Sequence, residues 1–273
     1  MHVTVAARSD VGMIRAGNED SFFADATTTR GVFVVADGMG GHAAGEVASE
    51  MAVQIVTRHL NGVTDVASRD ANRQMVTALK EANRAIYERT LAEVDKQGMG
   101  TTTSVLILAG NRYLIGQVGD SRIYLLRDGA LKQVTKDHSY VQEQVDAGYL
   151  TLEQARYHPY SNVITRCVGA SDSVEPDTYS GEIKGGDLFL VASDGLTGMV
   201  DDRRLQQILL QRASPGPMVD ALIREANGRG GLDNITAIVV QVTEVDPAKA
   251  DSTTGEIPAV PPPPGPDRPT PAG

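Results

Sequence analysis

The stretch VFVVADGMGGHAAGEVASE, residues 32–50, passes from an apolar run through one aspartate and a glycine-rich turn into a segment of helical period. The β-branched residues before Asp37 are typical of a buried strand, and the apolar residues of 45–60 recur at helical spacing. A strand, glycine turn and helix can cradle a phosphate group. A carboxylate at the end of a strand can instead hold a metal ion, and the rest of the chain decides between these hypotheses.

Two phosphate-loop patterns fit the spacing of this stretch but not its chemistry. In the P-loop pattern that begins at Gly40, Glu46 and Val47 stand where Lys and Ser or Thr handle the terminal phosphates. The dinucleotide pattern G-x-G-x-x-A begins at Gly38, but no acidic residue follows about 20 positions later in a second strand, as ribose binding requires. Asp37 would also repel a pyrophosphate unless a cation lay between them. Nucleotide binding is therefore disfavoured.

Acidic residues recur at the ends of the apolar stretches along the chain. A single Asp in a turn is explained by local hydrogen bonding, but a set of acidic residues beside buried strands favours a shared site. Oxygen ligands suit Mg²⁺ or Mn²⁺, whereas zinc is disfavoured because one Cys and five His form no paired ligand motif. The set comprises Glu19, Asp20, Asp37, Asp120, Asp194 and Asp233.

Arg15, four residues before Glu19, indicates what such a metal site would act on. A guanidinium group can hold a phosphate with two parallel hydrogen bonds, and a surface arginine is the alternative. Two hard cations roughly 3.5–4 Å apart can activate water and clamp a phosphoryl group. The carboxylates and Arg15 together predict metal-dependent phosphoryl hydrolysis.

The composition disfavours several other classes of protein. The 273 residues carry a net charge of −10 and only 4% aromatic residues, so we expect no nucleic-acid partner. Cys167 is the single cysteine, which excludes an internal disulfide and favours a reducing compartment. We find neither a signal peptide nor an apolar run of the roughly 18 residues that a membrane span needs. A cytoplasmic, monomeric protein with no membrane segment in this chain is therefore expected.

The chain divides near residue 245. Nine of the 13 prolines lie in residues 246–273, a composition that cannot bury a core and predicts a disordered Pro-rich tail. Residues 1–245 then form one catalytic domain, in which adjacent strands and blocks of helices predict an α+β fold with antiparallel sheets. Strands are expected at 2–7, 21–26, 31–37, 102–109, 112–118, 122–127, 188–193 and 234–242, and helices at 45–60, 70–94, 203–212 and 217–228.

Eight short motifs follow one another along the chain: RAGNED (15–20), VVADGMGGH (34–42), MGTT (99–102), VGDSR (118–122), TKDHS (135–139), ITRCVG (164–169), VASDGL (191–196) and LDNIT (232–236). In this order they resemble the metal-dependent protein serine/threonine phosphatases of the PPM (type-2C) family, most of all its bacterial members. The resemblance covers residues 3–243 and implies a central antiparallel β-sandwich flanked by α-helices on both sides. It implies an enzyme that hydrolyses phosphoserine and phosphothreonine by attack of a metal-bridging hydroxide. Its partners would be phosphorylated proteins, including the bacterial Ser/Thr protein kinases whose signalling it reverses.

The same resemblance implies which residues hold the cofactors, two to three divalent cations that are either Mn²⁺ or Mg²⁺. Asp37 would bridge two cations, with the carbonyl of Gly38 on one of them. Asp194 and Asp233 would bind the other cation. A third cation, often present in bacterial members, would be shared by Asp120 and Asp194.

Further roles follow from the resemblance. Glu19 and Asp20 would act on the metals directly or through water, and Arg15 would hold the substrate phosphate. Between Asp137 and Arg166, such proteins have a mobile flap beside the active site, and here this segment has helical character. The flap and the Pro-rich tail also leave room for an alternative function, a regulatory, pseudophosphatase-like module that acts through partner contacts.

The group that protonates the leaving serine or threonine stays open. Many relatives have His directly after the bridging Asp-Gly, where this chain has Met39. His42, three residues further on, is a candidate catalytic acid, but it can equally be a surface residue at the start of a helix. Proton donation by metal-bound water would need neither residue.

Overall fold

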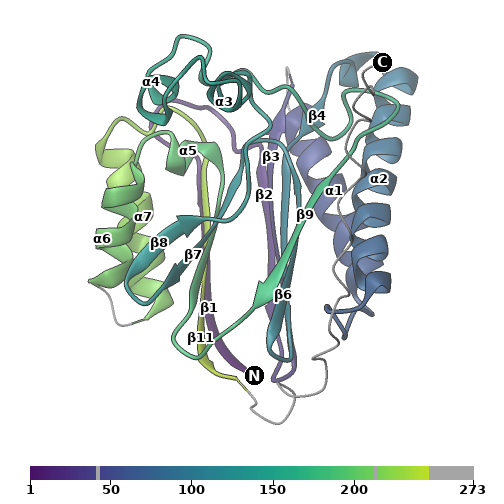
Figure 1. Ribbon diagram of the computed structural model, residues 1–273. Coiled ribbons are helices and arrows are strands. Elements are labelled where there is room, and N and C mark those ends of the chain that lie inside the picture. The colour runs from purple at the N-terminus through teal and green to yellow at the C-terminus, as the bar shows by residue number, and fades with distance from the viewer. Residues whose placement is uncertain (41–43, 212–213, 246–273) are drawn as a thin grey trace, which may run out of the picture.

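The computed structural model describes residues 1–40, 44–211 and 214–245 and has an α+β architecture (Figure 1). Two antiparallel β-sheets pack face to face, and helices cover the outer face of each sheet (Figure 1). The prediction of a β-sandwich flanked by helices on both sides is therefore confirmed. Both His42 and the tail predicted for 246–273 lie outside the described residues.

The first sheet joins the first and last strands of the described domain. Its strands in spatial order are β1 (His2–Asp10), β11 (Ile235–Glu244), β10 (Leu188–Ala192), β7 (Arg122–Arg127) and β8 (Ala130–Gln133). Asp10 at the end of β1 lies opposite Ile235 at the start of β11. Because the two strands are antiparallel, the loop that carries Arg15 and the loop that carries Asp233 meet at the same end of the sheet.

The second sheet brings two of the acidic residues together through its register. Its strands in spatial order are β2 (Asp20–Ala26), β3 (Arg30–Met39), β5 (Thr103–Ala109), β6 (Arg112–Val118) and β9 (Asp177–Glu182), while the short β4 (Gly100–Thr101) pairs with the end of β3. Asp20 at the start of β2 is the direct partner of Asp37 near the end of β3.

Strand β3 explains why residues 32–36 are uniformly apolar. Phe33 and Val35 belong to the core between the two sheets, whereas Val32 and Val34 belong to the core beneath the helices. Successive side chains of a strand point to opposite faces, so a strand that is buried on both faces loses the polar alternation of a surface strand. The strand thereby becomes a rigid support for Asp37.

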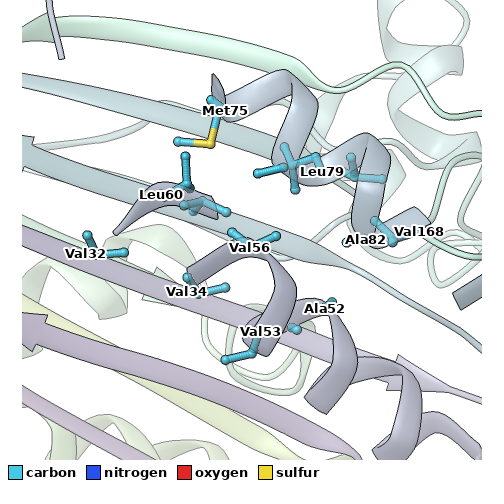
Figure 2. Close-up of a cluster of buried hydrophobic side chains, with 14 of the residues drawn as sticks. Val32, Val34, Ala52, Val53, Val56, Leu60, Met75, Leu79, Ala82 and Val168 are labelled. Atoms are coloured by element: carbon cyan, nitrogen blue, oxygen red, sulfur yellow. The ribbon is translucent and has the colours of Figure 1, made fainter. Parts of the chain in front are cut away.

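Helices α1 (Ala44–Leu60) and α2 (Arg69–Ala92) cover the second sheet. Figure 2 shows Val34 of β3 close to Ala52 and Val56 of α1, with Leu79 of α2 packed in the same cluster. The side chain of Ser68 caps the first turn of α2 by accepting from the amide of Ala71. On the other side of the sandwich, α6 (Asp202–Leu210) and α7 (Pro215–Gly228) cover the first sheet (Figure 1).

The structure adds short elements that the sequence analysis did not predict. Strand β9, with the polar sequence DTYSGE, lies at the edge of its sheet and is only half-buried, so it lacks the apolar pattern of a strand. The helical flap, by contrast, was predicted, and it contains α3 (Tyr140–Asp146) and α4 (Leu152–Arg156). The short helix α5 (Asp194–Thr197), which follows β10, was not predicted. In the part of the chain that the structure describes, no helix is both long and apolar enough to cross a membrane.

Candidate metal and phosphate site

The predicted acidic residues come from both sheets to one end of the sandwich. Asp20 and Asp37 lie side by side on β2 and β3, and Asp194 is the first residue of α5. Figure 1 shows α5 at the end of the sandwich that also holds the start of β2 and the end of β3. Asp120 follows β6, and Asp233 precedes β11. The expected convergence of these side chains is therefore present in the structure.

Hydroxyl groups hold these carboxylates in place. The hydroxyl of Ser193 donates to Oδ2 of Asp20 over 2.8 Å and accepts from the amide of Thr236 over 2.9 Å. Thr102 accepts from the amide of Asp37 over 2.9 Å, and its hydroxyl is hydrogen-bonded to that of Ser121 over 2.7 Å. Ser193 therefore connects Asp20 to β11, which follows Asp233. Thr102 connects Asp37 to Ser121, which follows Asp120. Sequence analysis missed these roles, although Thr102, Ser121 and Ser193 lie inside the quoted motifs.

Burial and mutual repulsion disfavour negative charge on the clustered carboxyl groups. Burial raises the pKa of Asp20 to about 7. Hydrogen bonds from Thr236 and Ser193 lower this pKa, whereas repulsion by the negative charge of Asp194 raises it further. Burial also raises the pKa of Asp37 well above its usual range, and the negative charges of Asp20 and Asp194 add to the effect. For Asp120, burial and the charge of Asp194 raise the pKa in the same direction. The described residues therefore place more negative charge in this cluster than nearby positive charges neutralise.

The arginines nearest to this cluster already have carboxylate partners. Arg122 donates through Nε and Nη2 to Oδ2 of Asp137 over 2.9 and 2.7 Å. Arg15, in the loop after β1, donates through Nη2 to Oδ2 of Asp233 over 2.7 Å while its side chain stays half exposed. Neither guanidinium neutralises the excess negative charge at Asp20 and Asp37, so the cluster suits bound cations.

Three buried oxygens support this interpretation directly. Within residues 1–40, 44–211 and 214–245, Oδ1 of Asp20, Asp120 and Asp194 each lacks a hydrogen-bond partner. A buried carboxylate oxygen without a partner is costly, and a divalent cation or its water ligands would satisfy it. The residues present therefore fit Mg²⁺ or Mn²⁺.

The cluster is not a cage made of side chains alone. Among the described residues, no three or more His, Cys, Asp or Glu side chains form a group that could hold a metal ion. A hydrated cation of the Mg²⁺ type usually takes one or two carboxylates and completes its shell with water and substrate phosphate oxygens. The described carboxylates therefore suit a cation that keeps several of its water ligands.

The glycines of the opening stretch allow close packing around Asp37. A Cβ on Gly38 would lie 2.1 Å from the carbonyl oxygen of Gly45 and 2.5 Å from that of Glu19. A Cβ on Gly45 would lie 2.8 Å from the carboxyl carbon of Glu19. The start of α1 and the loop before β2 can reach the end of β3 only because both positions lack a side chain.

Asn234 fixes the loop that carries Arg15. Its side chain donates to the carbonyls of Val11 and Gly17 over 3.0 and 2.9 Å and accepts from the amide of Glu19 over 2.8 Å. Burial raises the pKa of Glu19, against the positive charge of Arg15. One side chain thus positions the predicted phosphate-binding residue and a predicted metal ligand together.

A cavity of about 590 Å³ lies between the carboxylates and the predicted flap. Its floor includes Asp120, Asp194 and Asp233, and its opposite wall includes Leu152 and Arg156 of α4. Arg156 donates to the carbonyl of Thr197 over 3.2 Å, which connects the flap to α5. The predicted position of the flap beside the acidic residues is therefore confirmed.

The raised pKa of Asp20 predicts a specific pH dependence of stability in the metal-free protein. The pKa of Asp20 rises from 3.8 to about 7 on folding, so between these pH values the folded state binds more protons than the unfolded state. The free energy of unfolding therefore falls as pH rises through this window. We expect Asp20→Asn to stabilise the metal-free protein at pH 8 by up to about 4 kcal/mol relative to wild type. The difference should shrink steadily toward pH 4.5.

Urea unfolding with a chelator present, repeated from pH 4.5 to 8, measures this difference. Asp25→Asn is a suitable control, because Asp25 is an exposed residue of the same strand. Parallel stability curves for wild type and Asp20→Asn would contradict the expected linkage.

Comparison with known proteins gives consistent similarities. The family model described as protein phosphatase 2C matches residues 15–223. The serine/threonine protein phosphatase PstP of Mycobacterium tuberculosis is 42% identical over 241 residues, which make up 88% of this chain and 45% of PstP. The serine/threonine phosphatase stp of Listeria monocytogenes is 38% identical over 236 residues, 86% of this chain and 94% of that protein. The chain therefore spans less than half of PstP but most of the shorter relative.

Solved structures show the same similarity in three dimensions. The crystal structure of the PstP catalytic domain in complex with two manganese ions matches with a TM-score of 0.78 at 39% identity, covering 89% of this chain and 99% of that chain. The crystal structure of the phosphatase Stp1 from Staphylococcus aureus matches with a TM-score of 0.84 at 30% identity, covering 89% of this chain and 96% of that chain.

Proposed function

Since the chain belongs to the protein phosphatase 2C family, we propose that it is a metal-dependent phosphatase that hydrolyses phosphoserine and phosphothreonine in proteins. The observation that carries the proposal is the group of buried carboxylates with unpartnered oxygens at Asp20, Asp120 and Asp194. Divalent cations bound there would neutralise the carboxylates, polarise the phosphoryl group and lower the pKa of water.

The chain's own residues would prepare this chemistry. Asp37, which pairs with Asp20 and precedes the closely packed Gly38, is the proposed central ligand, and Asp194 and Asp233 would join it on one cation. Two cations are proposed by analogy with the two manganese ions of the PstP structure. Mn²⁺ or Mg²⁺ would serve, and Asp120 would contribute to a third cation together with Asp194.

Arg15 is proposed to bind the substrate phosphate. Its guanidinium lies beside Asp233 and remains half exposed, so it can turn toward a phosphate group without leaving the site. Glu19 and Asp20 would orient water around the cations. His42 stays one candidate for the acid that protonates the leaving hydroxyl, and water is the other.

The wider setting of the activity also belongs to the proposal. We infer that residues 1–245 are the catalytic domain of a monomeric, cytoplasmic enzyme and that residues 246–273 are a separate tail. Its substrates would be phosphorylated proteins, since the related proteins are named serine/threonine phosphatases, and we propose that Ser/Thr protein kinases are among them. A purely regulatory binding module is less well supported, because every expected carboxylate is present in the site.

Release of inorganic phosphate from a phosphothreonine peptide in the presence of Mn²⁺ tests the proposed function. We expect turnover of this peptide and of its phosphoserine counterpart, because both carry the phosphate on a short aliphatic side chain. A Mn²⁺-loaded protein that releases no phosphate from either Ser or Thr peptide would overturn the proposal.

A further inference from the structure

Large apolar side chains are exposed directly beside Arg15 and Asp233. Met13, Ile14 and Leu232, which we call the apolar rim, are 66%, 67% and 56% exposed. Met13 and Ile14 immediately precede Arg15, and Leu232 immediately precedes Asp233. Exposed apolar side chains that gather next to a site are unfavourable in water and commonly mark a binding surface.

The two loops that carry the apolar rim are fixed against each other. The amide of Met13 donates to the carbonyl of Gly231 over 2.8 Å. A Cβ on Gly231 would lie 2.8 Å from Cγ of Met13, so the methionine side chain rests on this glycine. Gly12, at a φ of +79°, leaves no space for a Cβ, which would lie 2.2 Å from the carbonyl oxygen of Asp233. The apolar rim is therefore a preformed surface.

The apolar rim is continuous with the cavity of the proposed active site. Leu232 and Asp233 line this cavity together, so one loop supplies both an apolar wall and part of the acidic floor. Leu152 of α4 lines the same cavity from the flap. Leu232 of the apolar rim and Leu152 of the flap therefore both border the cavity that a substrate enters to reach the carboxylates.

We propose that the apolar rim binds the residues next to the phosphorylated Ser or Thr and selects substrates with large apolar side chains there. This inference rests on the proposed function and specifies its substrate class. A phosphoserine side chain is short, so the backbone that carries it has to cross the edge of the cavity. The three side chains of the apolar rim are uncharged and exposed, so apolar contact is the attraction that the rim itself offers to a neighbouring residue.

Two phosphothreonine peptides, identical except for Leu or Ser on both sides of the phosphorylated residue, test this inference. We expect the wild-type protein to favour the Leu peptide about tenfold in kcat/KM, since burying a leucine side chain is worth at least that factor. In the double variant Met13→Ser with Leu232→Ser, the ratio of the two kcat/KM values should fall toward one. The ratio is the readout because damage to the neighbouring Arg15 or Asp233 would slow both peptides equally.

Leu91→Ser provides the matched control. Leu91 is 69% exposed near the end of α2, on the outer face of the second sheet, and the change should leave the peptide ratio as in wild type. The binding of both peptides, each labelled with a fluorophore, is measured in parallel by fluorescence anisotropy. Tighter binding of the Leu peptide that the double variant loses would support the apolar rim, even if neither peptide were hydrolysed and the proposed function failed.

Three outcomes would overturn the inference. Equal kcat/KM and equal binding of the two peptides by wild type would remove the selectivity while leaving the proposed phosphatase activity intact. A ratio that the double variant retains would place the selectivity elsewhere. Sedimentation of wild type as a dimer and of the double variant as a monomer, with equal peptide turnover, would assign the apolar rim to a second copy of the chain.

Discussion

Replacing Asp37 with Asn is expected to lower kcat/KM for a phosphothreonine peptide by about a thousandfold or more, because the proposed central metal ligand loses its charge. The same change should make the metal-free protein more stable. Burial and the charges of Asp20 and Asp194 raise the pKa of Asp37 well above its usual range, so a neutral amide of the same shape relieves repulsion. Activity and stability should therefore change in opposite directions.

Phosphate release with Mn²⁺ and thermal unfolding with a chelator measure the two effects. Asp25→Asn, which removes an exposed carboxylate from β2, should change neither quantity appreciably. If Asp37→Asn retained near-wild-type activity, the central role of Asp37 would be excluded. If it lowered the melting temperature without metal, the idea of an uncompensated charge cluster would fail.

Removing divalent cations is expected to abolish activity to a similar degree, about a thousandfold, because amino-acid side chains cannot replace a divalent cation as the Lewis acid that polarises the phosphoryl group. Chelation should also destabilise the protein relative to its Mn²⁺-loaded form. At a free Mn²⁺ concentration about 100 times the dissociation constant, binding stabilises the folded state by roughly 2.7 kcal/mol. In a domain of this size, that corresponds to a melting temperature roughly 5–10 °C higher with Mn²⁺.

Calorimetric unfolding and peptide hydrolysis, each with Mn²⁺, with Mg²⁺ and with a chelator, check this expectation. Asp37→Asn serves as the control, since its melting temperature should respond much less to either cation. Full activity in excess chelator would contradict metal dependence outright. Activity that returns with Mg²⁺ as well as with Mn²⁺ would show that the site accepts both cations.

Most of the fold follows from local patterns in the sequence. The uniformly apolar run 32–36 predicts a buried strand, and β3 is indeed buried, on both of its faces. The helical period of 45–60 likewise corresponds to α1. Strand β9 could not be predicted, because its polar sequence becomes a strand only through hydrogen bonds to β6 at the edge of the sheet. A pattern of burial cannot reveal an element that is mostly not buried.

The carboxylates of the candidate site were predictable because each one stands where an apolar strand begins or ends. Their supports were not predictable from residue type. Ser193 and Asp20 are 173 positions apart, and Thr102 and Asp37 are 65 apart, so their hydrogen bonds depend on strand register. Serine and threonine are common in turns for local reasons, and nothing in the sequence separates these from the rest.

The sequence by itself therefore determined which acidic residues belong together and which chemical family they resemble, since ligand type and strand position are local properties. Tertiary structure alone decided the electrostatics and the surface around them. It placed Arg15 against Asp233, 218 positions away, and left one oxygen of Asp20, Asp120 and Asp194 unpartnered. It also joined the loops of Met13 and Leu232 into one apolar surface. These features arise from contacts between segments that are distant in the sequence, which the pairing of β1 with β11 and the packing of the two sheets bring together.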